Sequence, residues 1–200
     1  MTDNYQQLAN SNVAEAFHSP PTDLARRLGG QQTDSGITLK AFGRRWVLTP
    51  TAVMAENDQG SSVEALLVSL YARHNNSAPM QREPFVAFKE LPDSAPYAGA
   101  FARHAQLSLA PFVPLMDQRR DDLCALMDGA LAKNPPAGDL AFTLHPLPKI
   151  ALHYICYHAD EDFPAAVTCL YSHNASIFMP TDALADVGEY TAKAIIAMFG

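Results

Sequence analysis

The sequence predicts an α+β domain, with an N-terminal meander and a C-terminal antiparallel sheet of three to four strands packed with several helices. Apolar residues recur about every 3.6 positions at the start of the chain, from residue 61 to 74, and at the end, which is typical of helices. Elsewhere they alternate with a period of two, which is typical of strands. The strands are grouped and do not alternate with helices, so we expect no doubly wound parallel sheet.

The first half of the chain is expected to form helices, a small meander and a core helix. Pro20-Pro21 and Gly29-Gly30 end the two opening helices, because proline restricts the residue before it and glycine tolerates the left-handed conformation. Thr22 is the expected cap of the second helix, and Ser61-x-x-Glu64 is a capping-box pattern. In order, the expected elements are helices at 4–17 and 23–28, a polar loop at 31–36, strands at 37–42, 45–49 and 51–55, and a helix at 61–74.

The second half is expected to form a surface segment, two helices, a sheet and a closing helix. Four prolines between residues 75 and 96 favour a segment that wraps around the core. Asn134-Pro135-Pro136 should end the second of the two helices, and Thr181-Asp182 should cap the closing one. In order, the expected elements are a short strand at 85–88, helices at 97–107 and 117–133, strands at 139–144, 149–157 and 165–171, an edge strand at 176–179, and a helix from 181.

The two periods also predict which side chains are buried. Residues on the apolar face of a helix, or on the inward face of a strand, should lie in the core. The expected buried residues are Leu66, Leu67, Leu70, Leu126, Ile150, Leu152 and Leu170.

Composition excludes several classes of protein. The chain has 200 residues and 48% of them are apolar, which suits a single domain with one core and excludes a disordered chain. No run of 18 apolar residues occurs, and the polar first twelve residues do not resemble a signal peptide, so we expect no membrane association. The formal net charge of -7 makes nucleic acid and anionic membranes poor partners.

The cysteines indicate a reducing compartment. Cys124, Cys156 and Cys169 are an odd number and form no C-x-x-C pair, so neither a disulfide framework nor a cluster site is encoded. We therefore expect a cytoplasmic protein in which these thiols behave as small apolar side chains.

Several segments, in one order, resemble a known family. They are Arg45-Trp46-Val47-Leu48, the helix at 63–74, the run from Phe85 to Pro92 with Tyr97 and Phe101, Gly138-Asp139, Leu147-Pro148-Lys149, Asp160-Glu161-Asp162-Phe163-Pro164, Leu170-Tyr171 and Pro180-Thr181. Together they resemble the bacterial and archaeal family catalogued as domain of unknown function 3786, from about residue 38 to 196. Residues 1–35 would then be an N-terminal helical extension, and 36–200 a family-like core.

The resemblance implies a biological setting and not a reaction, because the family carries no established activity. Its members occur mainly in anaerobes, and some are fused to a cysteine-rich iron–sulfur domain like that on corrinoid proteins. This setting favours an accessory role in cofactor or metal metabolism.

The acidic triplet Asp160-Glu161-Asp162 is the first candidate ligand-binding site. It follows a strand and precedes Phe163-Pro164, where the chain reverses and side chains point outward. Carboxylates there can bind a hard cation or act as base and acid. Alternatively, they solvate a turn or cap backbone N–H groups. Phe163 is expected to anchor the turn in the core.

A late group of histidines suggests a second possibility. His158 with Asp160 or Glu161 and a cross-strand His173 would make a mixed nitrogen and oxygen site suited to zinc or iron. No H-x-H or H-E-x-x-H spacing occurs, so the alternative is that these histidines are incidental.

Lys89 and Tyr97 complete the set of candidate ligand-binding residues. Both lie in or next to the proline-rich segment, and loops on a scaffold often build clefts. If this segment folds over the end of the late sheet, both can face the acidic triplet. The simpler alternative pairs Lys89 with Glu90 or Asp93 at the surface.

Two classes of function follow. No G-x-S-x-G motif and no phosphate-binding glycine motif occurs, which favours a non-enzymatic accessory protein that binds a small-molecule ligand or a protein partner. The alternative is a small metal-dependent enzyme that uses residues 160–162 with a nearby histidine. The sequence identifies neither a cofactor nor an oligomeric state.

Overall fold

The computed structural model describes residues 4–58, 60–133 and 137–200, and it contains two antiparallel sheets packed with helices. The expected α+β class is confirmed. None of the described helices combines the length and apolar character needed to cross a membrane.

The N-terminal half forms a four-stranded meander with helices beside it. Its elements are α1 (Asn4–His18), α2 (Leu24–Arg27), β1 (Gln31–Thr33), β2 (Gly36–Ala41), β3 (Arg44–Leu48), β4 (Val53–Ala55), the 3₁₀ turn η1 (Glu56–Asp58) and α3 (Ser62–Arg73). The strands pair in chain order, each antiparallel to the next.

The C-terminal half forms a five-stranded sheet in the order β5-β9-β8-β7-β6, again antiparallel. Its elements are β5 (Val86–Ala87), η2 (Phe88–Glu90), α4 (Ala98–Phe101), the π-helical turn η3 (Ala102–Gln106), η4 (Leu107–Phe112), α5 (Val113–Gln118), α6 (Arg120–Leu126), β6 (Ala130–Leu131), β7 (Leu140–Leu147), β8 (Ile150–Tyr157), β9 (Ala166–Tyr171), η5 (Ala175–Ile177) and α7 (Thr181–Ala197).

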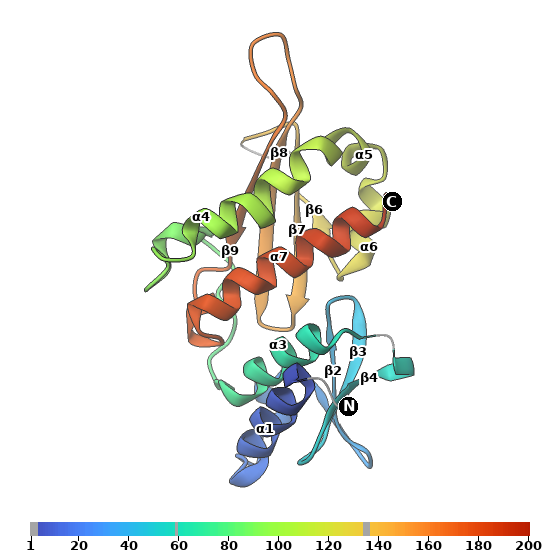
Figure 1. Cartoon of the computed structure of the whole chain (residues 1–200), viewed down its shortest axis with the longest axis vertical. Helices are drawn as coiled ribbons and strands as arrows, with labels where there is room; N and C mark the ends of the chain where they lie inside the picture. Colours follow the sequence, from blue (N-terminus) through green and yellow to red (C-terminus); the bar gives the residue numbers. More distant parts are fainter. Residues whose placement is uncertain (1–3, 59, 134–136) are drawn as a thin grey trace.

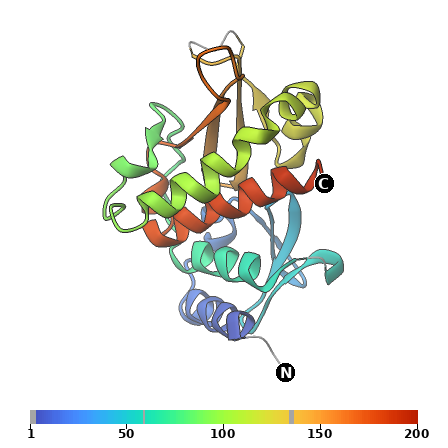
Figure 2. The ribbon, with the colours of Figure 1, turned by 45° about the horizontal axis from the view of Figure 1, so that its top comes forward.

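Helices cover one face of the five-stranded sheet. α7 and the helical run from α4 to α5 cross this face (Figure 1). Figure 2 shows α1, α3 and α7 following one another towards the sheet. Buried apolar residues of both halves form one connected core. Gly188 of α7 permits the close approach of α4, because a Cβ at this position would overlap the ring of Phe101.

The capping box of α3 is confirmed. Ser61 Oγ accepts the N–H of Glu64 at 3.2 Å, and Glu64 Oε2 accepts the N–H of Ser61 at 2.8 Å. α1 packs on the outer side of α3, where Asn12 Nδ2 donates to Ser69 Oγ at 3.0 Å. With helices on two sides, α3 has a broader buried surface than one apolar stripe.

The predicted core is confirmed only in part. Leu67, Ile150 and Leu152 are buried, with at most 1% of their surface exposed. The prediction was wrong for the remaining four, which are only partly buried: Leu66, Leu70, Leu126 and Leu170.

Strand β1 lies where the sequence predicted a polar loop. Its three residues are exposed, so no alternation of apolar side chains marks it. The strand forms because a tight turn ends at Gly36, whose φ of +133° favours glycine, and because Gln32 then pairs with Ile37.

Two predicted caps are wrong. Asp23, not Thr22, holds the N-cap position of α2, and its carboxylate pairs with Arg26 and Arg27 of the following turn. At α7 the N-cap is Pro180, and Thr181 Oγ1 donates to Pro92 O at 2.7 Å. In both cases the side chain binds another partner and caps no N–H group: Asp23 pairs with arginines, and Thr181 donates to a distant carbonyl.

The helix predicted at 117–133 is interrupted. α6 ends at Leu126, Asp128 has a φ of +50°, and Ala130 and Leu131 form β6 beside β7. Gly129 packs so closely against β7 that a Cβ there would lie 2.6 Å from Thr143 O. The residues after it therefore pair with β7 and do not continue the helix. The helix end predicted at 134–136 lies outside the described residues. The predicted edge strand at 176–179 is also wrong, because residues 175–177 form the 3₁₀ turn η5.

The turn between β2 and β3 joins the two halves. Phe42 and Gly43 have φ of +50° and +74°, as in a tight hairpin turn, and Phe42 is nevertheless buried. The N–H of Phe42 donates to Pro146 O of β7 at 2.7 Å, and Gly43 lies directly against the backbone of Leu126. This turn therefore sets the distance between the meander and the helices of the second half.

Candidate functional site

The acidic triplet lies in the loop between β8 and β9, which projects beyond the end of the sheet (Figure 1, orange). Asp160 Oδ1 accepts the N–H groups of Asp162 at 2.9 Å and Phe163 at 2.7 Å. The N–H of Asp160 donates to Phe163 O at 3.0 Å. Asp160 thus stabilises its own turn, whereas Glu161 and Asp162 are exposed.

The expected anchoring of this turn by Phe163 is wrong. Its side chain is 70% exposed, at the tip of the projecting loop. The loop is held instead by the Asp160 carboxylate, which accepts two backbone N–H groups. The side chains of Glu161, Asp162 and Phe163 are therefore exposed and can contact another molecule.

These contacts predict different effects for neighbouring acids. Asp160→Ala should speed amide hydrogen exchange at Asp162 and Phe163, because both N–H groups lose their acceptor. Glu161→Gln should leave the melting temperature within about 2 °C of the parent protein. Exchange measured by NMR, together with thermal unfolding, checks both. If Asp160→Ala and Glu161→Gln changed amide exchange at Asp162 and Phe163 by the same amount, this account of the loop would be contradicted.

His158 contacts the opposite side of the loop base. Its N–H donates to Asp139 Oδ2 at 2.8 Å, and its Nε2 lies 3.2 Å from Asp117 Oδ2 of α5. His173 does not lie nearby, because it follows Tyr171, which pairs with Leu152 at the other end of β8. The proposed mixed ligand set with His173 is therefore not assembled. Among the described residues, no group of three or more His, Cys, Asp and Glu side chains is placed to hold a metal ion.

Lys89 and Tyr97 lie apart from the acidic triplet. Lys89 borders a hollow beside Thr168 and Cys169, and Tyr97 borders a different one beside Asp182. Neither hollow is lined by any residue of the β8–β9 loop. Within the described part of the chain, Lys89 also has no ion pair with Glu90 or Asp93.

Other reactive side chains are occupied by the fold. Burial raises the pKa of the Cys156 and Cys169 thiols to about 12, so both stay protonated near neutral pH. Burial lowers the pKa of His153, which lies 2.9 Å from Thr143 Oγ1 and stacks on Phe85. These groups serve packing, as expected for the two cysteines.

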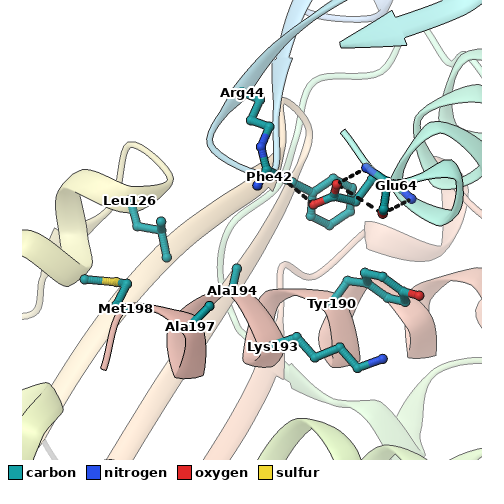
Figure 3. A pocket seen from close by; sticks show the side chains of 10 residues that line it. Phe42, Arg44, Glu64, Leu126, Tyr190, Lys193, Ala194, Ala197 and Met198 are labelled. Atoms are coloured by element: carbon teal, nitrogen blue, oxygen red, sulfur yellow. Dashed lines mark hydrogen bonds and ion pairs between the residues drawn. The ribbon is translucent and has the colours of Figure 1, made fainter. Parts of the chain in front are cut away.

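A cleft between the two halves, here called the junction cleft, has the features of a small-molecule site. It has a volume of about 470 Å³ and opens where the β2–β3 turn, the start of α3, the end of α6 and α7 meet (Figure 3). Its apolar lining comes from Phe42, Leu126, Ala194, Ala197 and Met198. Sites of this size with largely apolar walls commonly hold small molecules.

Two cations and one carboxylate also line the junction cleft. Arg44 Nη1 donates to Glu64 Oε1 at 2.7 Å, and Glu64 is buried and further bound by Ser61. Lys193 pairs with Glu189 at 2.7 Å and lies over the ring of Tyr190, 4.4 Å from its centre. The hydrogen bond from Lys193 to Glu189 raises the pKa of the lysine, which therefore stays charged. Both cations are about half exposed and have donors left over.

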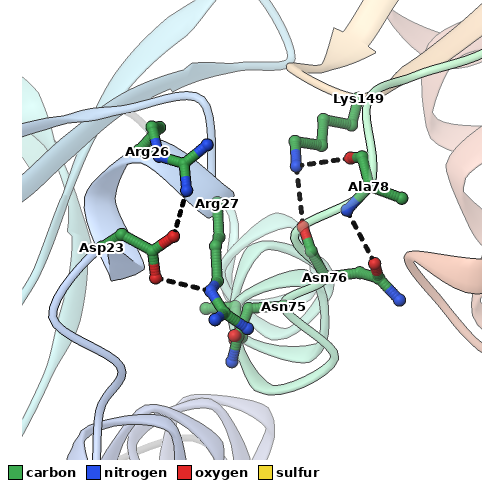
Figure 4. Close-up of polar contacts among 8 residues, drawn as sticks. Asp23, Arg26, Arg27, Asn75, Asn76, Ala78 and Lys149 are labelled. Atoms are coloured by element: carbon green, nitrogen blue, oxygen red, sulfur yellow. Dashed lines mark hydrogen bonds and ion pairs between the residues drawn. The ribbon is translucent and has the colours of Figure 1, made fainter.

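Polar contacts also join the two halves just after the end of α3 (Figure 4). Lys149 Nζ donates to Asn76 O at 2.7 Å and to Ala78 O at 2.9 Å, so it holds the segment after α3 against β8. Burial, followed by the charges of Arg26 and Arg27, lowers the pKa of Lys149. The lysine of the Leu147-Pro148-Lys149 segment thus has a structural partner that its sequence neighbours do not reveal.

The residues of the junction cleft were not candidates in the sequence. They come from four distant segments, and none carries a motif that indicates a binding site. The capping box at 61–64 was the local signal recognised among them, and it indicates structure and not a site.

Comparison with known proteins supports the family resemblance. Residues 20–194 match the family described as Domain of unknown function (DUF3786). No curated protein and no solved structure matches the chain significantly.

Proposed function

The chain belongs to the DUF3786 family, whose description names no function, and from its own geometry we propose a non-enzymatic binding protein that holds a small organic anion in the junction cleft. The observation that carries this proposal is the combination of an apolar floor with two exposed cations where the two halves meet. The ligand class is a carboxylate, phosphate or sulfonate attached to an apolar body.

The apolar part of the ligand lies on the wall formed by Leu126, Met198 and the alanines of α7. Ala194 and Ala197 leave space that larger side chains would fill. The largely buried ring of Phe42 also lines the cleft. Burial of an apolar body here stabilises the complex by about 25 cal/mol for each Å² removed from water.

The anionic group binds at Arg44 and Lys193. A guanidinium has five N–H donors, and Glu64 accepts from only one nitrogen of Arg44. The ammonium of Lys193 likewise keeps donors beyond its bond to Glu189. A bound anion would complete these donor sets without displacing either internal ion pair.

The polar groups of the cleft favour binding over catalysis. Glu64 is the sole carboxylate among the described lining residues, and it already accepts from Arg44 and Ser61. Burial raises the pKa of Tyr190, which keeps that hydroxyl protonated. Neither group is suited to act as a base on a bound molecule.

An accessory role in the cofactor or metal metabolism of anaerobes, within the cytoplasm, remains part of this proposal. The family resemblance supports the setting, and the three unpaired cysteines support a reducing compartment. The charge of -7 favours a small ligand or protein over nucleic acid as the partner.

The test uses 1-anilinonaphthalene-8-sulfonate, which joins an aromatic body to an anion, as a fluorescent probe of the cleft. Ala197→Trp should fill the cleft and weaken probe binding about ten-fold or more, whereas Ala14→Trp on exposed α1 should not. Arg44→Gln should weaken binding about ten-fold, and the neighbouring exposed Arg45→Gln should leave it unchanged.

Thermal unfolding of each variant separates loss of the site from loss of the fold. If Arg44→Gln is unstable because Glu64 loses its partner, Lys193→Gln gives an independent test at an exposed position. Probe affinity that is unchanged in both folded Ala197→Trp and Lys193→Gln would overturn the proposal.

A further inference from the structure

The first part of β9 has one edge to which no described strand pairs. β5 pairs only with Leu170 and Tyr171, after which the chain turns away into η2. The N–H and C=O of Cys169 and Val167 point away from β8, because alternate residues of an antiparallel strand face alternate neighbours. For Val167, neither group has a hydrogen-bond partner within the described ranges.

A side chain occupies part of this edge. Gln106 of the π-helical turn η3 accepts the N–H of Cys169 through Oε1 at 3.0 Å. Its amide oxygen therefore takes the place that the carbonyl of a neighbouring strand would hold. Because Gln106 is partly exposed, its side chain can turn away without opening the core.

An apolar hollow lies beside the same edge, here called the edge hollow. It has a volume of about 340 Å³, and Phe88, Phe101, Ala102 and Cys169 contribute to its lining. Side chains of an added strand alternate between the two faces of the sheet, so every second one would enter this hollow. The edge hollow shares no lining residue with the junction cleft.

Opposite charges mark the two ends of the edge. Lys89 lines the edge hollow near the end of β5, and no described carboxylate pairs with it. At the start of β9, the loop presents exposed Glu161 and Asp162 together with the exposed ring of Phe163. A strand that continues the direction of β5 would begin at the lysine and end at the acids.

The geometry points to a peptide-binding function: β9 accepts an extended segment of a partner protein as an additional antiparallel strand. The segment exchanges main-chain hydrogen bonds with Cys169 and Val167 and replaces Gln106 as the acceptor. Alternate apolar side chains fill the edge hollow. An acidic residue at its amino end meets Lys89, and a basic residue at its carboxyl end meets Glu161 and Asp162. This second site extends the function beyond the binding of a small anion.

The test uses two synthetic peptides and a pair of matched variants. The first peptide, acetyl-Glu-Phe-Thr-Val-Thr-Lys-amide, carries the expected charges, and the second exchanges its Glu and Lys. We expect the first to slow amide exchange at Val167 and to bind about five-fold more tightly than the second. Lys89→Glu should remove most of this preference. Ala102→Leu should fill the edge hollow and abolish binding, whereas Ala100→Leu, exposed on α4, should not.

NMR of the full chain gives exchange rates and affinities, and thermal unfolding confirms that each variant is folded. The proposal is overturned if millimolar peptide leaves the Val167 amide unprotected, or if folded Ala102→Leu binds as well as the parent protein. It is also overturned if Val167 is already protected in a concentration-dependent dimer, since the occupant would then be a second copy of the chain. None of these outcomes bears on the junction cleft, which is tested through Arg44 of β3 and through Lys193 and Ala197 of α7.

Discussion

Replacing Trp46 with alanine is expected to lower the free energy of unfolding by about 3–5 kcal/mol. The indole is 1% exposed, packs directly against Gly60, and donates from Nε1 to Ala41 O at 3.0 Å. The substitution removes the largest buried side chain of the meander and leaves a buried carbonyl without its donor.

Urea unfolding followed by circular dichroism measures this effect, because the chain has a single tryptophan and loses its fluorescence signal with it. Met54→Ala on the neighbouring strand is the control, since Met54 is 53% exposed and should change stability by less than about 0.5 kcal/mol. A loss at Trp46 as small as that at Met54 would mean that the meander packs differently.

Replacing Leu152 with alanine should cost about 2–5 kcal/mol. Leu152 lies near the start of β8, between β7 and β9, is completely buried, and faces the helices that cover the sheet. Leu170 on the adjacent strand lies on the opposite face and is only partly buried. Leu170→Ala should therefore cost less than Leu152→Ala when both are measured by urea unfolding. The reverse order would show that the assignment of sheet faces is wrong.

Local patterns were enough to predict much of the fold. Ser61 and Glu64 form the expected capping box because both partners lie within one turn. The parity of residues 150–157 correctly placed Ile150 and Leu152 in the core, because one face of the strand meets helices.

The errors arise where contacts between distant segments decide the structure. Ala130 and Leu131 continue a helical pattern, yet they pair with β7 because the chain turns at Asp128. Leu66 and Leu70 belong to the predicted apolar stripe of α3, but neighbouring helices bury other sides of that helix more completely. Neither the pairing with β7 nor the packing of helices around α3 can be predicted from a short stretch of sequence.

The candidate sites show the same limit. Asp160 was correctly considered a possible turn cap, because its carboxylate and the N–H groups that donate to it lie within three residues. Arg44 and Lys193 are 149 positions apart, counted from their sequence numbers, and only the packing of α7 against the meander brings both to one cleft. The part of β9 to which no described strand pairs likewise depends on where β5 ends, which no sequence signal specifies.

Native mass spectrometry of the purified chain after incubation with a small-molecule extract of cells tests the central claim most directly. The parent protein and the Ala14→Trp control should each retain one small molecule per chain that carries an acidic group and an apolar body. Folded Ala197→Trp should retain none, because its indole occupies the junction cleft. Retention of the same molecule by Ala197→Trp at the same level would contradict the claim that the cleft between the halves is the binding site.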